Sequence, residues 1–292
     1  MATDRLDVRK TYKLYLGGRF PRSESGRTFE ITDSKGRFLA NAARASRKDV
    51  RDAVVAARKA QQGWAAATAY NRGQVLYRVA ELLEGRRDQF VAEVVAAEGL
   101  STRKATSQVD SAIDRWVHYA GWTDKYAQVD GGLNPVAGPY FDLSVPEPTG
   151  VVAAIAPQRS SLLGLTAVLA PLLVSGNTAV VVASERRALP AITLSEVLAT
   201  SDVPGGVVNL LTGHVTELAP VLAGHLDVDA LDLTGCTGTE VDTEELERLA
   251  AENVKRVVPA PAEEPAFDAG PAGPARILAF CETKTVWHPK GT

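Results

Sequence analysis

The fold of this protein is decided by residues 150–185, GVVAAIAPQRSSLLGLTAVLAPLLVSGNTAVVVASE. Two short apolar segments, Val151–Ala156 and Thr178–Val182, flank a longer apolar segment, Leu162–Val174. Short strands without polar alternation are typical of a parallel sheet that is buried on both faces, and the longer segment has the length of a helix. The stretch therefore predicts a strand–helix–strand unit of an α/β fold.

The same alternation continues as far as residue 258. We expect further strands at Val207–Leu211, Ala230–Leu233 and Arg256–Val258. Between them we expect helices at Pro190–Thr200, Thr216–Gly224 and Thr243–Asn253. The predicted fold class is thus α/β, a Rossmann-like open parallel sheet with helices on both faces.

The residues before this sheet are predicted to be mainly helical. Strands are expected only at Tyr12–Phe20 and Arg27–Asn41, which are separated by turn residues. Ser46 and Asp49 have the spacing of a capping box, so a helix should begin there. Apolar residues recur at helical spacing within Gln74–Gly85 and Lys104–Tyr126, which predicts two more helices.

Composition excludes several classes of function. The chain has 292 residues, and its 32 Lys and Arg against 35 Asp and Glu give a net charge of only −3. Without a long run of one sign, nucleic acid and anionic membranes are not expected partners. No signal peptide is recognisable, and no apolar run reaches the ~18 residues of a membrane span. The two cysteines, Cys236 and Cys281, and the four scattered histidines form neither a disulfide framework nor a metal motif. We expect a cytoplasmic protein without a metal site.

Three segments belong to neither the helices nor the parallel sheet. Val129–Pro148 contains turn residues followed by an alternating apolar pattern, which predicts a hairpin. Pro259–Ala275, PAPAEEPAFDAGPAGPA, has the composition of a linker. Glu282–His288, ETKTVWH, is typical of an edge strand. A hairpin with one further strand is only marginally stable alone, so these strands should pack against something else.

Several ordered motifs resemble the aldehyde dehydrogenase family. They are EPTGVVAAIAP at Glu147–Pro157, LAPLLVSGNTAVVV at Leu169–Val182, VPGGVVNLLTG at Val203–Gly213 and HLDVDALDLTG at His225–Gly235, together with DVRDAVVAARKAQQGW at Asp49–Trp64 and the tail ETKTVWH. The resemblance implies an NAD-binding-like domain formed by residues 1–128 and 149–258, and an oligomerisation arm formed by residues 129–148 and 276–292. Residues 259–275 would then be a linker that replaces the family's catalytic domain.

The same resemblance implies that the catalytic residues are missing. The absent domain carries the family's nucleophilic cysteine, so we assign no catalytic residue in this chain. Ala260 aligns with the general-base glutamate and cannot transfer a proton. Arg159 replaces the asparagine whose amide stabilises the oxyanion. Cys236 and Cys281 lie elsewhere in the alignment, and we expect both to be packed, unreactive thiols.

The cofactor motifs of the family are also altered. Of its KPxE motif only Glu185 remains, and the loss of a charge-assisted bond of ~1.5–3 kcal/mol implies binding about ten- to a hundredfold weaker. The GSTxxG loop begins after Thr234 with Gly235, but Glu240 replaces its second glycine. We therefore expect Glu185, Thr234 and Gly235 to form only a vestigial site. No cofactor is expected in this chain, and NAD is expected in a partner subunit.

These observations suggest a pseudoenzyme subunit that assembles with a full-length aldehyde dehydrogenase as a hetero-oligomer. It would be similar to the degenerate second half of the double-length members of that family. The residues expected to bind the partner through strand addition are Tyr140, Phe141, Asp142, Leu143, Ser144, Val145, Thr283, Lys284, Thr285, Val286 and Trp287. Two alternatives remain open. One is an NAD-dependent aldehyde oxidoreductase that uses Cys236, and the other is a nucleotide or anion binder that uses Arg159 and the helix start near Ser160.

Overall fold

The computed structural model describes residues 10–268, 270 and 273–291. The first residues of the expected 1–128 domain, part of the expected linker and the last residue of the arm lie outside the described residues. Among the described helices, none has the length and apolar character needed to cross a membrane.

A five-stranded parallel sheet with the strand order β10-β9-β6-β7-β8 forms the centre of the molecule. Its strands are β6 (Val151–Ile155), β7 (Thr178–Val182), β8 (Val208–Leu211), β9 (Ala230–Asp232) and β10 (Arg256–Val258). Every residue of β6, β7, β8 and β9 is buried, which explains the absence of polar alternation in the sequence. The predicted Rossmann-like α/β fold is confirmed.

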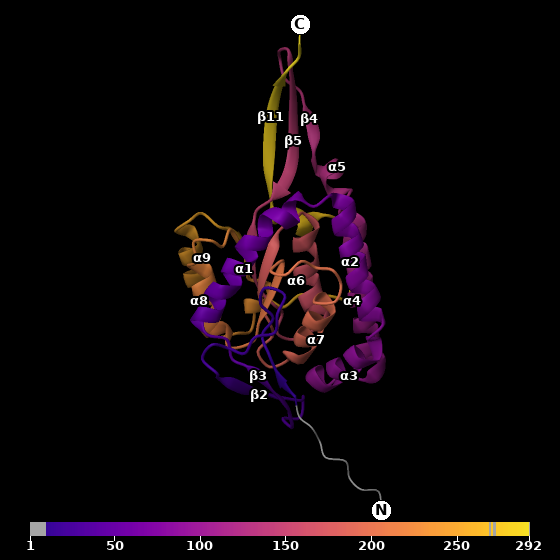
Figure 1. Ribbon diagram of the computed structural model, residues 1–292, viewed down its shortest axis with the longest axis vertical. Coiled ribbons are helices and arrows are strands. Elements are labelled where there is room, and N and C mark those ends of the chain that lie inside the picture. The colour runs from indigo at the N-terminus through magenta and orange to yellow at the C-terminus, as the bar shows by residue number, and fades with distance from the viewer. Residues whose placement is uncertain (1–9, 269, 271–272, 292) are drawn as a thin grey trace, which may run out of the picture.

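Helices cover both faces of this sheet (Figure 1). Alternate residues of β6 divide between two cores: Val151 and Ala153 pack with α1 and α8, whereas Val152 and Ala154 pack with the opposite helix layer. One layer contains α1 (Arg47–Ala66), α8 (Val215–Ala223) and α9 (Thr243–Ala251). The other contains α2 (Ala69–Glu84), α3 (Arg87–Glu98), α4 (Thr102–Trp122), α6 (Leu163–Val174) and α7 (Leu189–Leu198).

The amino-terminal region differs in part from the expectation. The capping box is present, because Ser46 accepts from the Asp49 amide and the Asp49 carboxylate accepts from the Ser46 amide. The expected strand Tyr12–Phe20 is reduced to β1 (Thr11–Tyr12) and isolated bridges. The expected strand Arg27–Asn41 is two antiparallel strands, β2 (Thr28–Thr32) and β3 (Phe38–Ala43). The connecting turn breaks the predicted strand because Asp33 accepts from backbone amides within it.

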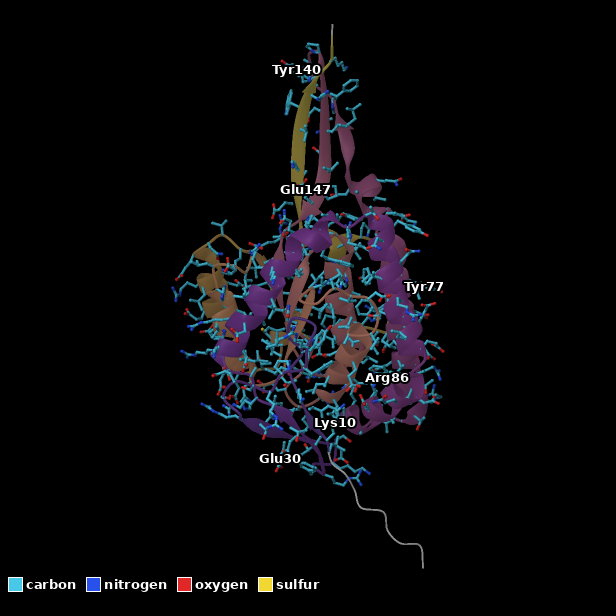
Figure 2. All side chains as sticks on the ribbon, in the orientation of Figure 1. Lys10, Glu30, Tyr77, Arg86, Tyr140 and Glu147 are labelled. Carbon is cyan, nitrogen blue, oxygen red and sulfur yellow. The ribbon has the colours of Figure 1, made fainter. Side chains whose placement is uncertain are left out.

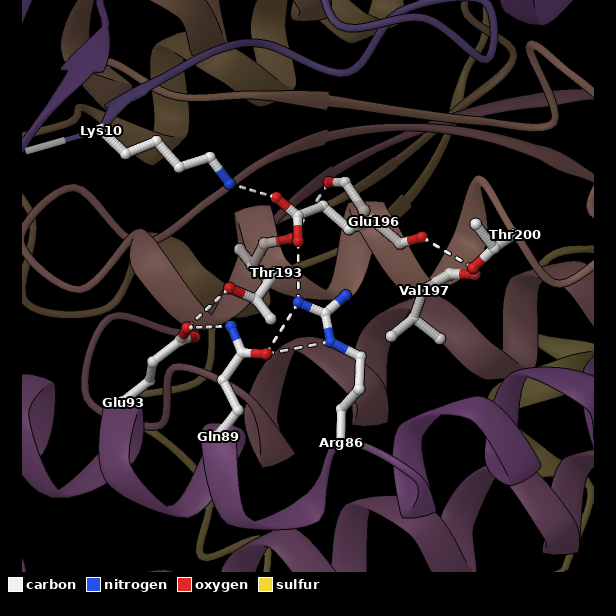
Figure 3. Close-up of polar contacts among 10 residues, drawn as sticks. Lys10, Arg86, Gln89, Glu93, Thr193, Glu196, Val197 and Thr200 are labelled. Atoms are coloured by element: carbon white, nitrogen blue, oxygen red, sulfur yellow. Dashed lines mark hydrogen bonds and ion pairs between the residues drawn. The ribbon is translucent and has the colours of Figure 1, made fainter. Parts of the chain in front are cut away.

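A polar network ties the start of the described chain to α3 and α7 (Figure 3). Glu196 of α7 forms ion pairs with Lys10 and with Arg86, the latter at 2.7 Å. Glu93 of α3 accepts from the Thr193 hydroxyl at 2.8 Å and from the Gln89 amide at 3.0 Å. Burial nevertheless raises the pKa of the Glu93 carboxyl.

A three-stranded antiparallel sheet projects from the body of the molecule (Figure 1). We call it the arm. It has the order β11-β5-β4, with β4 (Gly132–Asn134), β5 (Tyr140–Pro148) and β11 (Cys281–Pro289). Figure 2 shows Tyr140 near the tip and Glu147 near the base. The predicted hairpin and tail strand are therefore paired with each other, although residues 129 and 130 belong to a short helix, α5 (Tyr126–Asp130). Another short helix, α10 (Ala275–Leu278), precedes β11.

Candidate functional site

The carboxyl ends of β6, β7, β8 and β9 meet at one edge of the parallel sheet, where an open α/β fold binds its ligands. The loops that follow these strands enclose a crevice of about 410 Å³. Its lining residues are Gln158, Arg159, Glu185, Arg186, Arg187, His214, Thr216, Thr237, Gly238, Thr239 and Glu240. Glu240 thus lines the same cavity as Glu185, as the altered motifs suggest.

The Glu185 side chain is engaged in a hydrogen bond to the start of a helix in this crevice. Its carboxylate accepts from the backbone amide of Val215, the first residue of α8, and its other oxygen lies 3.9 Å from Nδ1 of His214. A carboxylate at a helix amino terminus satisfies an otherwise unpaired amide and interacts favourably with the helix dipole. The Glu185 side chain therefore serves as a cap for α8.

Thr234 and Gly235 are buried beneath the crevice. The Thr234 amide and hydroxyl both donate to the carboxylate of Asp232. A side chain at position 235 would collide with the backbone, because its Cβ would lie 2.1 Å from the carbonyl oxygen of Ala156. Gly235 thus allows the short 3-10 turn η1 (Thr234–Cys236) to pack against β6. Of the expected cofactor residues, only Glu185 lines the cavity.

The loop between β6 and α6 holds an acidic side chain from the linker. The backbone amides of Gln158, Arg159 and Ser160 all donate to the carboxylate of Glu264, at 3.0, 3.0 and 3.1 Å. Consecutive amides that converge in this way form an anion-binding nest. The chain therefore fills this nest with its own carboxylate, and the backbone donors of the expected anion site near Ser160 are engaged.

Sequence reasoning missed Glu264, although a glutamate pair in a segment of Pro, Ala and Gly was a visible signal. Two more contacts hold the linker across this edge of the sheet. The Thr237 hydroxyl donates to the carbonyl of Pro261 at 2.7 Å, and the Arg115 guanidinium donates to the carbonyl of Phe267. Ala260 lies at the start of this path and packs against the core on the α1 side of the sheet.

Neither thiol has the surroundings of a nucleophile. Cys236 and Cys281 are 3% and 7% exposed. Burial raises the pKa of Cys236 to about 12 and that of Cys281 to about 11. The Asp232 carboxylate adds to the effect at Cys236. Within the part of the chain that the structure describes, no group of three or more His, Cys, Asp or Glu side chains could hold a metal ion.

The expected partner-binding residues all lie in the arm. Leu143 faces Val286 across the sheet and Trp287 faces Asp142. Trp287 is 58% exposed and contacts Tyr140, with ring centroids 5.8 Å apart. Asp142 is buried and accepts a hydrogen bond of 3.2 Å from the Asn134 amide. Ser144 joins Asn134 to Thr285 by hydrogen bonds of 2.7 and 2.8 Å.

Comparisons with known proteins agree with this architecture. Residues 20–260 match the model of the aldehyde dehydrogenase family. Human cytosolic 10-formyltetrahydrofolate dehydrogenase is 30% identical over 97% of this chain and 31% of its own length. Cytosolic aldehyde dehydrogenase 1 from Elephantulus edwardii is 32% identical over 84% of this chain and 49% of its own. The chain thus spans half or less of these relatives.

Solved structures give the same result. An NAD⁺ complex of an aldehyde dehydrogenase from Bacillus cereus superposes with a TM-score of 0.80 and 27% identity, over 85% of this chain and 50% of that one. The HpcC protein from Thermus thermophilus superposes with a TM-score of 0.78 and 31% identity, over 85% of this chain and 47% of that one. This chain belongs to the aldehyde dehydrogenase family.

Proposed function

We propose that this chain is a non-catalytic subunit that assembles with a full-length aldehyde dehydrogenase through the arm, in a structural or regulatory role. The observation that carries the proposal is the surface of the arm, which combines an apolar face with an unpaired strand edge. The resemblance implies that, in the family, this sheet extends the catalytic-domain sheet of a neighbouring subunit. Here the linker occupies the place of that domain, so a second kind of chain has to supply the acceptor.

The apolar face of the arm is the first support. Leu143 pairs directly with Val286 on β11 and with Leu133 on β4, and side chains of paired residues share a face. Phe141 and Val145 lie two residues from Leu143 and point the same way. These side chains are 41–63% exposed. A contiguous apolar patch of this kind on a protein surface is typical of an interface.

The free edge of β11 is the second support. Two hydrogen bonds flank the β5–β11 ladder: Lys290 donates to Pro139, and Thr149 donates to Phe280. Both bonds join an even-numbered residue on the β11 side to an odd-numbered residue on the β5 side. In an antiparallel ladder, hydrogen-bonded pairs alternate with pairs that are not hydrogen-bonded, so the even-numbered residues of β11 bond to β5. The odd-numbered residues Thr283, Thr285 and Trp287 therefore direct their backbone groups away from β5. The outer edge of β11 therefore offers main-chain donors and acceptors for strand addition.

The catalytic assignments support a partner that carries the chemistry. Ala260 stands where the resemblance places the general base, and the only two cysteines of the chain are buried thiols with raised pKa values. We propose that NAD and the aldehyde bind to the partner subunit. Neither alternative is favoured by an observation, because an oxidoreductase would need the buried Cys236 and an anion binder would need amides that Glu264 already engages.

The test is co-expression of this chain with the full-length aldehyde dehydrogenase of the same organism, with a tag on this chain only. We expect a hetero-oligomer of defined mass whose NAD-dependent activity depends on the partner. Trp287→Ala should weaken the complex about tenfold or more, because exposed aromatic anchors dominate such interfaces. A discrete homo-oligomer that does not retain the partner would contradict the proposal.

Proline variants separate strand addition from damage to the arm. Thr283→Pro removes an outward amide and leaves the β5 ladder intact, whereas Lys284→Pro removes an inward amide and should loosen the arm itself. Thr283→Val is the matched control, because it keeps both the amide and a β-branched side chain. We expect Thr283→Pro to fold with wild-type stability and to lose the partner. Retention of the partner by this variant would exclude pairing through the β11 edge.

A further inference from the structure

A cavity of about 530 Å³ lies where β2 and β3 meet the amino terminus of α1. We call it the basic cavity, after the cationic residues that line it: Arg27, Arg44, Arg47, Lys48 and Arg51. Only two acidic residues line it as well, so its local net charge is +3 in a chain whose net charge is −3. Figure 1 shows β2 and β3 at the end of the molecule opposite the arm. Positive charge is therefore concentrated at one hollow far from the arm.

The fold brings these cations together from separate elements. Arg27 directly precedes β2 and Arg44 directly follows β3, and the Arg44 amide donates to the Arg27 carbonyl at 2.9 Å. Arg47, Lys48 and Arg51 belong to the first two turns of α1. The five side chains therefore converge because fixed backbone positions hold them around the same space.

The acidic residues of the basic cavity leave most of these cations unpaired. Glu217 of α8 forms an ion pair with Arg44, and Glu24 accepts from the Ser46 hydroxyl at 2.9 Å. Arg27 acts on Glu217 through its charge but forms no ion pair with it. Within the part of the chain that the structure describes, the side chains of the four cations other than Arg44 form neither an ion pair nor a hydrogen bond.

Arg44 also retains unused donors. Its hydrogen bond to Glu217 uses Nη2, whereas its Nε is buried without a hydrogen-bond partner among the described residues. A buried donor without a partner costs stability, so its retention calls for an explanation. The Arg44 side chain is 28% exposed, and its Nη1 has no partner in the described chain and is not buried. An anion in the basic cavity can therefore reach this guanidinium group.

The three cations of α1 oppose the stability of their own helix. They lie at the positive end of the helix dipole, where acidic side chains are favourable and cationic ones are not. Arg51 is also four residues from Arg47 and three from Lys48, so like charges are neighbours on the helix surface. The helix amides do not form the site, because the Ser46 side chain already accepts from the amides of Lys48 and Asp49. Residues that break a local rule in this way are expected at functional sites.

We propose that the basic cavity binds a compact polyphosphate anion, which contacts Arg44 and the three cations of α1. A phosphate group has acceptor oxygens in several directions, which suits cations that converge from different elements better than a planar carboxylate does. At least two phosphate groups are needed to balance a charge of +3. Ala45 is the only apolar residue among the described lining residues, so the cavity offers no surface to a nucleobase or a hydrocarbon chain.

This site shares no residue with the arm or with the crevice that Glu185 lines. Polyphosphate binding therefore does not depend on assembly with a partner. The inference goes beyond the proposed function because it gives the subunit a ligand of its own.

The experiment measures binding of pyrophosphate to the full chain by calorimetry in metal-free buffer, with inorganic phosphate and citrate as comparison probes. We expect pyrophosphate to bind at least about tenfold more tightly than either probe. Its affinity should fall as the salt concentration rises, because the contacts join opposite charges near the surface. Equal binding of phosphate or citrate, an affinity that does not depend on salt, or no heat with millimolar pyrophosphate would each overturn the proposal.

One variant with two controls locates the site. Arg47→Gln should weaken pyrophosphate binding about tenfold without lowering the melting temperature of the ligand-free protein, since it removes a cation from the first position of α1. Lys59→Gln is the control for loss of a charge on the same helix, because Lys59 is exposed and lies outside the cavity. Arg186→Gln is the control for the crevice, which Arg186 lines. Both controls should keep wild-type affinity. If Arg47→Gln binds pyrophosphate as the wild type does, or if Arg186→Gln loses it, the site assignment is wrong.

Discussion

Replacement of Glu264 by alanine should release the linker from the parallel sheet. The Glu264 carboxylate receives hydrogen bonds from three consecutive amides, those of Gln158, Arg159 and Ser160. A net ~1.5–3 kcal/mol is typical of a hydrogen bond to a charged group, but here water can replace the carboxylate because Glu264 is only partly buried. We therefore assign about 2 kcal/mol to the whole contact, which corresponds to a ~30-fold increase in local opening.

Hydrogen exchange by mass spectrometry of peptides that contain Gln158, Arg159 and Ser160 checks this estimate. Exchange of these three amides should become about 30-fold faster in Glu264→Ala, with the central sheet unchanged. Glu263→Ala is the matched control, because Glu263 is exposed and forms none of these bonds. Glu264→Gln should be intermediate, since it keeps one acceptor oxygen and loses the charge. Equal exchange of these three amides in wild type and Glu264→Ala would refute the assignment of Glu264 as the anchor.

Three further predictions concern stability and reactivity. Burial raises the pKa of the Glu93 carboxyl in the folded state, so the protonated carboxyl stabilises the fold at acid pH and this stabilisation is lost as pH rises. Urea unfolding should therefore show that Glu93→Gln is more stable than the wild type at neutral pH and as stable as the wild type at acid pH. Gly235→Ala should lower the free energy of unfolding by about 1–3 kcal/mol or more, because its Cβ would lie 2.1 Å from a carbonyl oxygen. Gly63→Ala, which lies in open space on α1, should raise the free energy of unfolding by about 0.5–1 kcal/mol. Cys236, with its pKa raised to about 12, should resist alkylation at neutral pH in the folded protein and react after unfolding in denaturant.

The central sheet was predictable because its strands are short runs of apolar residues, and such runs by themselves indicate strands that are buried on both faces. The segment Thr178–Val182 consists of residues suited to a buried strand, and the structure forms a strand with these bounds. The region Arg27–Asn41 was harder, since apolar residues flank a turn at Asp33–Gly36 and were read as one strand. The signals of that turn are an aspartate that accepts from following amides and a glycine, Gly36, with a φ of +78°.

The candidate site was less predictable because its main features come from the backbone. The nest at 158–160 depends on where three amides point, and residue types do not report this direction. Its occupant, Glu264, comes from a segment without periodicity, so no pattern could pair the two. Glu185 was identified from its motif, but its role as a cap for α8 appears only when the first amide of that helix is placed beside it.

The positions of the prolines in the arm bear on how its edge is used. Pro146 and Pro148 lie on the β5 register whose amides point toward β4, but beyond the residues that β4 pairs, so no ladder bond is lost there. Pro289 ends β11 at the tip, on the register that points outward.

Between Cys281 and Pro289 no proline interrupts the outer edge of β11, and the β5–β11 register runs without a shift. Exposed edges are normally protected by prolines, bulges or short length, and none of these interrupts β11 before its last residue, Pro289. An edge left open for this distance beside an apolar face is a feature to be expected of a strand that another chain completes.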